Sequence, residues 1–327
     1  MSGIENILQV EGLSIAVGSK HDSPLAAESV TFNVKRGEIF GMVGESGCGK
    51  SICALAVSGL LRSPLRTTAG RVMFEDKDIL ALNSREIRQL RGGRIAMIFQ
   101  EPMTALNPLM RVGDQIAEMF VLHERLSNSE ARRRAVAALE QVQVPSPEQR
   151  CADYPHQLSG GMRQRVMIAI AMACKPALLI ADEPTTALDV TIQAEIISLV
   201  LELCQQSGTA VLLISHDLGL VAETCNRVAV MYAGRIIEEQ RGDLIFSSPL
   251  HPYTRGLVAA LPRPGRRLAG GQKPLADIPG LVPPIGQRAA GCHFVPRCGR
   301  ADAKCKQDVP QATQLGGDGF VRCFHHG

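Results

Sequence analysis

Hydrophobic residues recur along this 327-residue chain with two different periods, so strands and helices are expected to alternate. Apolar and polar residues alternate at Ile7–Val17 and Ser29–Val34, which predicts strands of an antiparallel β-layer. Further strands are predicted from short apolar runs at Glu38–Val43, Gly70–Phe74, Ile95–Phe99, Ala177–Ala181 and Ala210–Ser215.

Three longer segments have apolar residues at the spacing that buries one face of a helix. They are Ile52–Leu61, Arg163–Cys174 and Val190–Gln206, and Gly208 is expected to stop the last of them. A hairpin is predicted where Ala229–Tyr232 and Arg235–Glu238 flank a short turn. Strands that alternate with helices indicate an α/β fold with a mostly parallel sheet covered on both faces.

Two stretches depart from this alternation. Residues 107–150 are rich in Ala, Arg, Glu and Gln with helical periodicity, and Pro145 and Pro147 are expected to break the helices there. Ten of the 19 prolines lie between Pro249 and Pro310, which predicts an irregular extension. We therefore expect a core with its β-layer at 1–99 and 158–245, an α-helical subdomain at 100–157 and a C-terminal extension at 246–327.

Composition narrows the class of protein only a little. The chain is 45% hydrophobic and 20% charged, and its formal charge of +3 is too small to indicate a nucleic-acid partner. No apolar run reaches the roughly 18 residues of a membrane-spanning helix, and the N-terminus lacks the pattern of a secretory signal. We therefore expect a chain that stays in the cytosol, where its ten cysteines are reduced.

A glycine-rich segment between a predicted strand and a predicted helix has the spacing G-x-x-x-x-G-K-S. Glycines let backbone N–H groups approach phosphates closely, and the helix that starts near Lys50 adds the positive end of its dipole. The Lys50 ammonium is expected to reach the β- and γ-phosphates and the Ser51 hydroxyl to bind Mg²⁺. The residues expected to hold the nucleotide here are Gly44, Glu45, Ser46, Gly47, Cys48, Gly49, Lys50 and Ser51.

Two carboxylates follow the apolar run Leu178–Ala181. Strands of an open α/β sheet deliver their carboxyl ends to the ligand crevice. Asp182 is therefore expected to hold Mg²⁺, directly or through water, and Glu183 to polarise the attacking water. A strand that merely ends in polar residues is the alternative, and the phosphate loop weighs against it.

A second glycine loop, Leu158-Ser159-Gly160-Gly161-Met162, completes a set of motifs that resembles the nucleotide-binding subunit of an ATP-binding-cassette (ABC) transporter over residues 7–245. Gly44–Ser51 resembles the Walker A loop and Leu178–Glu183 the Walker B strand. The second loop resembles the family signature L-S-G-G-Q. The remaining motifs are matched by Gln100 as the Q-loop, Ala187-Leu188-Asp189 as the D-loop and His216 as the switch histidine.

This resemblance implies a P-loop NTPase core of the RecA-like type and ATP hydrolysis with Mg²⁺. Two such subunits stack head to tail, so each ATP lies between the Walker A loop of one and the signature loop of the other. The resemblance implies four further ATP-binding residues, which are Ser159, Gly160, Gly161 and Asp189. The catalytic residues that it implies are Glu183, His216 and Gln100. Gln100 would also sense the Mg²⁺, and His216 would contact the γ-phosphate.

Two positions depart from the family pattern. Met162 stands where the signature has glutamine, but the contacts to the nucleotide are expected from Ser159 and the two glycine backbones. Val17 stands at the position where many relatives stack an aromatic ring on adenine, and a valine cannot stack in that way.

The extension resembles that of the oligopeptide, dipeptide and nickel importer ATPases. The resemblance is carried by Ser248-Pro249-Leu250-His251-Pro252-Tyr253-Thr254, by Ile278-Pro279-Gly280 leading into Gly291-Cys292, and in the core by Tyr154-Pro155-His156-Gln157. It implies an ATPase that energises an importer for dipeptides or oligopeptides, with D,D-dipeptides among the candidate solutes. A nickel importer is the alternative within the family.

The same resemblance implies the partners. They are a second ABC ATPase subunit, expected to be a paralogue, two membrane permease subunits docked on the helical subdomain and, indirectly, a periplasmic substrate-binding protein. The expected location is the cytoplasmic face of the bacterial inner membrane, as a peripheral protein.

Four of the ten cysteines fall near the C-terminus with the spacing C-x5-C-x6-C-x17-C: Cys292, Cys298, Cys305 and Cys323. Clustered thiols in a reducing compartment suggest a structural metal centre, either zinc or a [4Fe–4S] cluster, and free thiols are the remaining alternative. The importer subunits that this tail resembles carry an iron–sulfur cluster, so we expect that group, with zinc second. Cys48 is expected to be an inert small residue.

Two rival functions come from other classes. A soluble cassette ATPase of DNA repair or translation usually holds two cassettes or a long coiled coil, whereas this chain has one cassette and no heptad run. A metal-binding module that has lost catalysis is the other rival, and the complete catalytic set argues against it.

Overall fold

A computed structural model describes residues 6–20, 22–100, 105–184, 190–261, 278–317 and 319–326. The chain divides into two compact units. The first unit comprises Met1–Leu8, Val34–Glu38 and Met73–Leu213, and the second unit comprises Gln9–Asn33, Ile39–Val72 and Ile214–Gly327. The three regions expected from the sequence form a different division, which stays a prediction.

The first unit contains the core strands β6 (Ile95–Ile98) and β7 (Leu178–Asp182) and most of β8 (Ala210–Ile214), in the order β8-β7-β6. The strands β6 and β7 run parallel, with Ile95 opposite Leu178. Every residue of β7 and of β8 is buried. Continuous burial of this kind is typical of parallel strands covered on both faces, as the apolar runs predicted.

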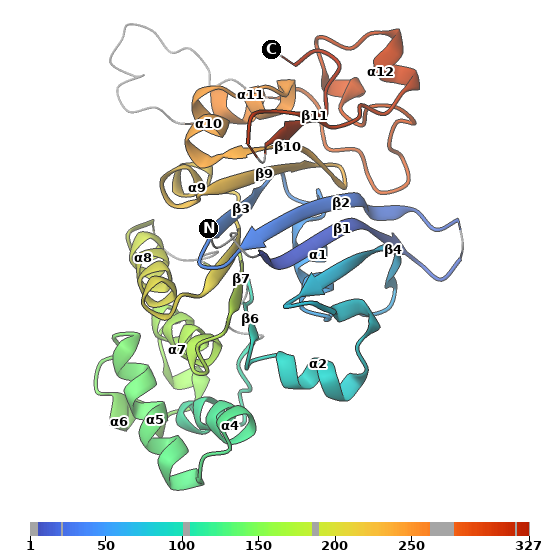
Figure 1. Cartoon of the computed structure of the whole chain (residues 1–327). Helices are drawn as coiled ribbons and strands as arrows, with labels where there is room; N and C mark the ends of the chain where they lie inside the picture. Colours follow the sequence, from blue (N-terminus) through green and yellow to red (C-terminus); the bar gives the residue numbers. More distant parts are fainter. Residues whose placement is uncertain are drawn as a thin grey trace, which may run out of the picture. The chain divides into compact units, whose positions relative to one another are not determined.

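The helices of the first unit are α2 (Ser84–Leu90), α4 (Val112–Glu124), α5 (Asn128–Gln141), α6 (Pro147–Cys151), α7 (Gly160–Met172) and α8 (Val190–Ser207). Figure 1 shows α4, α5 and α6 gathered into one group. The sequence predicted helices here but gave Pro147 the wrong role: it occupies the first turn of α6, where its missing N–H costs nothing, and so starts a helix. The sequence pattern also missed α2, which is short and held by a capping box between Asn83 and Glu86.

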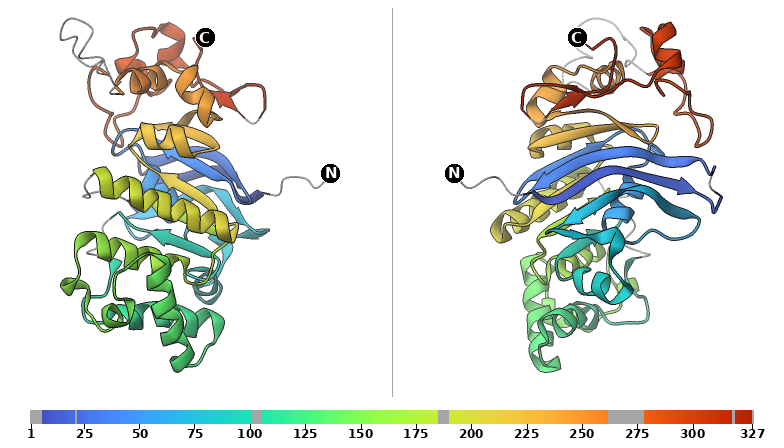
Figure 2. Two further views of the ribbon diagram at one scale, coloured as in Figure 1. Left: turned by 90° about the vertical axis from the view of Figure 1, so that its left-hand side faces the viewer. Right: turned by 45° about the vertical axis from the view of Figure 1, so that its right-hand side comes forward.

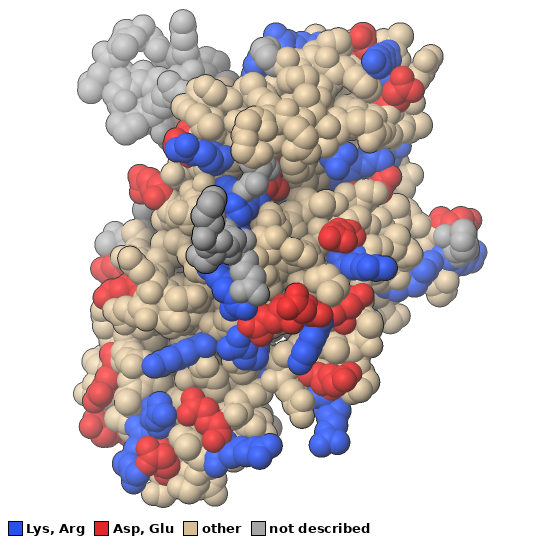
Figure 3. Space-filling view, in the orientation of Figure 1, with Lys and Arg blue, Asp and Glu red and all other residues tan. Residues whose placement is uncertain are grey.

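Charged side chains of both signs are interspersed over these helices (Figure 3). In the run Arg132–Arg134 each arginine faces a carboxylate: the partners are Asp114, Glu130 and Glu124 respectively. All three arginines are largely exposed. The run is therefore a solvated helix surface.

The second unit holds most of two long neighbouring strands, β1 (Asn6–Val17) and β2 (Leu25–Lys35), beside β4 (Leu65–Phe74), in the order β2-β1-β4 (Figure 2). The end of β4 pairs with the short strand β5 (Lys77–Asp78) in the first unit. Both β2 and β4 begin earlier than expected. The first residues of β4 are partly or fully exposed and carry little hydrophobic pattern, whereas β2 begins with the run Leu25–Ala27, in which apolar and polar residues do not alternate.

The other strands of the second unit are β3 (Ile39–Val43), β9 (Arg227–Tyr232), β10 (Arg235–Arg241), β11 (Thr313–Gln314) and β12 (Phe320–Val321), in the order β11-β12-β10-β9-β3. The strands β3 and β9 run parallel, whereas the pairs β9–β10, β10–β12 and β12–β11 are antiparallel. The predicted hairpin is present, with Arg235 opposite Tyr232. The C-terminal extension thus contributes strands to this sheet through the pairing of β12 with β10.

The helices of the second unit are α1 (Lys50–Val57), α9 (Leu218–Thr224), α10 (Gly242–Ser247), α11 (Pro252–Ala259) and α12 (Ala303–Gln307). The helix α1 starts two residues before the predicted Ile52 and ends before the predicted Leu61, because Gly49 allows an abrupt start and Gly59 turns the chain with φ 65°. The extension is less irregular than its proline content suggested, since His251 and Asp302 cap the short helices α11 and α12.

Among the described helices, none combines the length and the apolar character that crossing a lipid bilayer requires.

A buried ion pair links β9 to β10. Arg227 Nη2 lies 2.6 Å from Glu239 Oε1, and the two side chains are only 8% and 4% exposed. The same nitrogen donates to Asn33 Oδ1 at 2.7 Å, and the guanidinium lies 5.1 Å from the centre of the Phe40 ring. Such a pair is stable only while both charges are present, because a single buried charge has no compensation.

The Glu239→Gln variant should therefore lose about 3–5 kcal/mol of the free energy of unfolding, because it removes the carboxylate charge that lies 2.6 Å from the buried Arg227 guanidinium. Urea unfolding of the purified protein measures this loss. The matched control is Asp243→Asn in the exposed pair with Arg241, which should cost less than about 1 kcal/mol. Equal costs for the two substitutions would contradict the argument.

Candidate functional site

The phosphate loop keeps a shape that only glycine permits at two positions. Gly44 has φ 151°, and a Cβ there would lie 2.2 Å from the Met231 carbonyl oxygen. Gly49 has φ 112°, and its Cβ would lie 2.9 Å from the end of the Met231 side chain. The loop therefore packs directly against the end of β9, and the spacing of the two glycines has a steric cause.

Lys50 is held inside the loop that precedes it. Its Nζ donates to the Gly44 carbonyl at 2.7 Å and to the Glu45 carbonyl at 3.2 Å, and the residue is 4% exposed. Ser51 follows in the first turn of α1. The ammonium, the loop N–H groups and the start of the helix thus gather positive charge in one loop, the arrangement that the motif predicted for phosphates.

Cys48 lies in the floor of this loop. Its carbonyl accepts from Gly234 N at 2.8 Å, and its side chain is fully buried. Burial raises the pKa of the Cys48 thiol, and the nearby Lys50 charge only partly opposes this rise. A buried, protonated thiol is a poor nucleophile, which agrees with the small inert residue that we expected.

In the first unit, two of the predicted catalytic side chains contact each other. Gln100 follows β6, and its Nε2 donates to Glu183 Oε2 at 2.9 Å. Glu183 follows β7 directly and has φ 46°, which places its backbone in the left-handed region. Asp182, the last residue of β7, is 6% exposed. The carboxyl end of this strand thus presents two carboxylates beside an amide, as an Mg²⁺ and water site requires.

The signature loop runs into a well-formed helix start. Ser159 is the N-cap of α7, and its Oγ accepts from Met162 N at 3.3 Å. Gly160 and Gly161 are the first helical residues, and a Cβ at Gly160 would meet no atom of the described residues within 4 Å. Packing among the described residues therefore does not require a glycine at position 160.

Gln164 is a residue that the sequence patterns did not single out. It is 1% exposed on α7, and its Nε2 donates to the Pro184 carbonyl, just after the two carboxylates. This bond connects the signature helix to the Walker B segment inside the first unit. Its position between Arg163 and Arg165 gave no sign of burial in the sequence, although a buried polar side chain of this kind needs a partner.

His216 and Asp189 complete the predicted set. His216 lies in the second unit and is exposed. The residues around it are ordered by Ser215 Oγ, which accepts from Asp217 N at 2.9 Å, and by Asp217, which caps α9. Asp189 lies outside the described residues.

The motif His251-Pro252-Tyr253 connects the extension to the phosphate loop within the second unit. The hydroxyl of Tyr253 accepts from Glu45 N at 2.9 Å. His251 Nδ1 accepts from Tyr253 N at 3.0 Å, and burial lowers the pKa of His251 to about 3, so the ring is neutral at physiological pH. Because Nδ1 accepts, Nε2 carries the proton.

Glu45 also binds an arginine 252 positions later in the chain. Arg297 Nη1 lies 2.6 Å from Glu45 Oε2, and Nη2 lies 3.0 Å from Oε1, a bidentate ion pair. The Arg297 side chain is 3% exposed. Nothing in the local sequence pattern indicated this contact, because its partners are so distant along the chain.

All four C-terminal cysteines line one pocket, together with His251, Phe294 and His325. Every cysteine of the chain is a free thiol. Burial, with the three neighbouring thiols acting in the same direction, raises the pKa of Cys292 to about 11. The predicted set of four thiols is therefore brought together in space.

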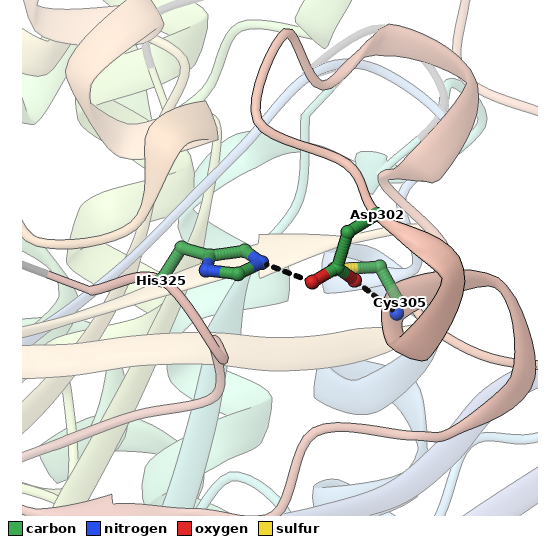
Figure 4. A group of neighbouring side chains, drawn as sticks. All are labelled: Asp302, Cys305 and His325. Atoms are coloured by element: carbon green, nitrogen blue, oxygen red, sulfur yellow. Dashed lines mark hydrogen bonds and ion pairs between the residues drawn. The ribbon is translucent and has the colours of Figure 1, made fainter.

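Beside this pocket, Asp302 connects Cys305 to His325 (Figure 4). One oxygen of Asp302 accepts from Cys305 N at 2.8 Å, and the other lies 3.0 Å from His325 Nε2. The ligand atoms of these three residues lie within 4.8 Å of one another. His325 N also donates to Cys323 Sγ at 3.3 Å, so the surrounding polar groups orient two of the four thiols.

Comparison with known families agrees with this geometry. Residues 27–186 match the ABC transporter family, and residues 237–305 match the C-terminal region of oligopeptide/dipeptide transporters. The second match contains His251, Tyr253 and three of the four cysteines.

Individual relatives cover almost the whole chain. The dipeptide transport ATP-binding protein DppD of Escherichia coli is 46% identical over 319 residues, covering 98% of this chain and 96% of that protein. The oligopeptide transport ATP-binding protein AppD of Bacillus subtilis is 44% identical over 322 residues, covering 98% and 97%.

A solved structure shares the fold. It is the ATP-binding cassette MJ0796, described as dimeric, in a post-hydrolysis state and bound to ADP and Pi, with a TM-score of 0.64 and 27% identity over 72% of this chain and 98% of that one. The P-loop fold and the family expected from the motifs are thus confirmed. The chain belongs to the ABC ATPase family, in the branch of the dipeptide and oligopeptide transport ATP-binding proteins.

Proposed function

We propose that this chain is the ATP-hydrolysing subunit of an importer for dipeptides or oligopeptides. The observation that carries the proposal is the phosphate loop closed around Lys50, in a chain whose relatives are named dipeptide and oligopeptide transport ATP-binding proteins. The match of the extension to the oligopeptide/dipeptide transporter region favours peptides over nickel as the solute class, and transport over DNA repair or translation.

The roles of the individual residues follow from their positions. Lys50 and the N–H groups of the loop bind the β- and γ-phosphates. Ser51, Asp182 and Gln100 are the candidate Mg²⁺ ligands, since hydroxyl, carboxylate and amide oxygens suit that ion. Glu183, which Gln100 orients at 2.9 Å, holds and polarises the attacking water, and His216 contacts the γ-phosphate.

The second half of each ATP site comes from a neighbouring subunit. Gly160 stands exposed at the start of α7, and no described residue lies within 4 Å of its Cβ position, so a surface outside the chain accounts for the glycine better than packing among these residues does. The free N–H groups of the first helical turn and the helix dipole attract a phosphate of the partner's ATP. The cassette MJ0796 is itself described as dimeric with ADP and Pi bound.

The wider assembly follows from the family. A second ATPase subunit, expected to be a paralogue, pairs with this one, and two permease subunits dock on the helices α4–α6 at the cytoplasmic face of the bacterial inner membrane. A periplasmic binding protein supplies the solute from the other side, so this chain carries no solute site of its own. D,D-dipeptides remain among the candidate solutes.

The four cysteines are proposed to hold a [4Fe–4S] cluster. Four thiolates in one apolar pocket repel one another, so a cationic centre is needed to compensate them. All four thiols line one pocket, the donor set that either zinc or a [4Fe–4S] cluster requires. The resemblance of the tail to importer subunits with an iron–sulfur cluster favours the cluster, with zinc as the alternative.

A buried donor in the same pocket also fits such a group. His251 is 1% exposed, and its Nε2 has no hydrogen-bond partner among the described residues. An N–H donor of this kind suits the sulfur atoms of an anionic cluster, and hydrogen bonds to sulfur adjust the reduction potential of such centres. The cluster would hold the proline-rich extension in one shape.

The Glu183→Gln variant should retain ATP binding and lose ATP turnover by at least about a hundredfold, because the amide can no longer polarise water. Turnover is measured by phosphate release in the assembled transporter, and binding by calorimetry on the isolated subunit. Turnover within a few-fold of the unchanged protein would count against this assignment.

Gly160→Leu should leave the folded chain stable but abolish ATP-dependent pairing of subunits, because the new side chain occupies only the surface offered to the partner. Analytical ultracentrifugation in the Glu183→Gln background measures pairing. The matched control is Gly316→Leu, another glycine whose Cβ position is open. Normal pairing and turnover of the Gly160→Leu protein would refute the shared site.

Cys298→Ser should remove most of the iron and acid-labile sulfide and lower the melting temperature of the extension. Metal analysis of anaerobically purified protein measures the content. The control is Cys174→Ser, whose thiol lies outside the pocket and contacts the Met119 carbonyl. Stoichiometric zinc in the unsubstituted protein would contradict the cluster and assign the site to zinc.

A further inference from the structure

Two features of the extension have no role in the ATP chemistry described above. One is the tyrosine of the motif His251-Pro252-Tyr253, and the other is Arg297. Both reach the same residue of the phosphate loop, Glu45, which directly follows Gly44. Loop and extension belong to the same compact unit, so these contacts are part of one packed body.

The contacts fix both the backbone and the side chain of Glu45. Tyr253 accepts from its N–H at 2.9 Å, while Arg297 holds its carboxylate at 2.6 and 3.0 Å. Two planar groups joined by two parallel hydrogen bonds leave little freedom of rotation. Glu45 is therefore clamped, and the adjacent carbonyl groups of Gly44 and Glu45, which hold the Lys50 ammonium, are clamped with it.

The arginine is itself rigidly mounted. Its Nε donates to the Pro279 carbonyl at 2.8 Å and its Nη2 to the Ile278 carbonyl at 3.0 Å. The guanidinium lies 5.8 Å from the centre of the Tyr232 ring, in a cluster of rings that includes Tyr253 and Phe294. A lysine could supply the charge at this position but could not make these divergent hydrogen bonds.

The clamp also neutralises the charge of Glu45. A carboxylate in a loop that receives a triphosphate repels it, and the repulsion is strong where water is partly excluded. The glutamate side chain is 32% exposed, whereas the paired arginine is almost fully buried. Arg297 therefore cancels a negative charge at the mouth of the phosphate site, in addition to fixing its geometry.

We propose that Arg297 and Tyr253 are positioning residues for ATP: by clamping and neutralising Glu45, the C-terminal extension sets the affinity of the phosphate loop for the nucleotide. The inference rests on the proposed role of this loop in binding ATP. This proposal makes the extension a functional part of the nucleotide site. The two positioning residues are also neighbours of the cysteine pocket, because Arg297 directly precedes Cys298 and Tyr253 follows His251 closely.

The test is the affinity for Mg²⁺–ATP, measured by calorimetry on the full chain with its metal centre intact. Arg297→Met should weaken binding about tenfold at low salt, because it leaves the Glu45 carboxylate facing the phosphates. Glu45→Gln removes the pair and the repulsive charge together, so its defect should be smaller. The double variant should bind like Glu45→Gln, and thus better than Arg297→Met alone.

Two further measurements separate this electrostatic role from a purely structural one. The defect of Arg297→Met should shrink as salt rises, because the unpaired charge is screened, and Arg297→Lys should recover part of the affinity. Tyr253→Phe, which keeps the ring and loses the hydroxyl, should weaken binding by about threefold through the Glu45 backbone. Melting temperatures verify that each variant folds.

The outcomes also separate this inference from the proposed function. Lys50→Ala should lose ATP binding whatever the role of Arg297; if it bound ATP normally, the phosphate-loop assignment itself would fail. If Lys50→Ala lost binding while Arg297→Met bound like the unchanged protein, only the clamp would be overturned. A double variant that bound no better than Arg297→Met would also overturn it, because damage to the fold is not relieved by removing a charge.

Discussion

The phosphate loop keeps its shape because the turn between β9 and β10 packs against its backbone. The carbonyl of Met231 lies where a side chain at Gly44 would be, and Gly234 N donates to the Cys48 carbonyl at 2.8 Å. Gly234 in turn has no room for a side chain, since its Cβ would lie 2.8 Å from the Ala26 carbonyl. Three segments that are distant in sequence thus form a single close contact, and any bulk introduced there displaces the loop.

The C-terminal extension packs against the same pair of strands, β9 and β10. Its strand β12 pairs with β10, and Tyr253 and Phe294 pack with Tyr232, the last residue of β9. Each aromatic ring in this cluster buries a large apolar area, and their tilted arrangements add a specific geometry. The extension is therefore continuous with the hydrophobic core of the second unit, although its proline content predicted only an irregular segment.

Sequence reasoning succeeded where the signal is local. The strand-loop-helix order around Lys50 and the carboxylates at the end of β7 follow from residues that are close neighbours in the chain. It failed for Gln164 with Pro184 and for Glu45 with Arg297, because partners separated by 20 and 252 positions leave no periodic pattern. Short capped helices such as α2 and α12 were also missed, since five or seven residues are too few for a hydrophobic period to emerge.

The burial of Cys48 has a practical consequence for chemical labelling. Cys48, Cys53, Cys204, Cys225 and Cys305 are shielded from solvent, and the remaining cysteines are partly accessible. A maleimide or iodoacetamide probe would therefore react first with cysteines outside the phosphate loop. Among these, Cys151 and Cys174 react slowly, because burial raises the pKa of each thiol to about 11. Inactivation by such reagents would report on damage to the tail or to the helical region, and would say nothing about the thiol beneath the nucleotide.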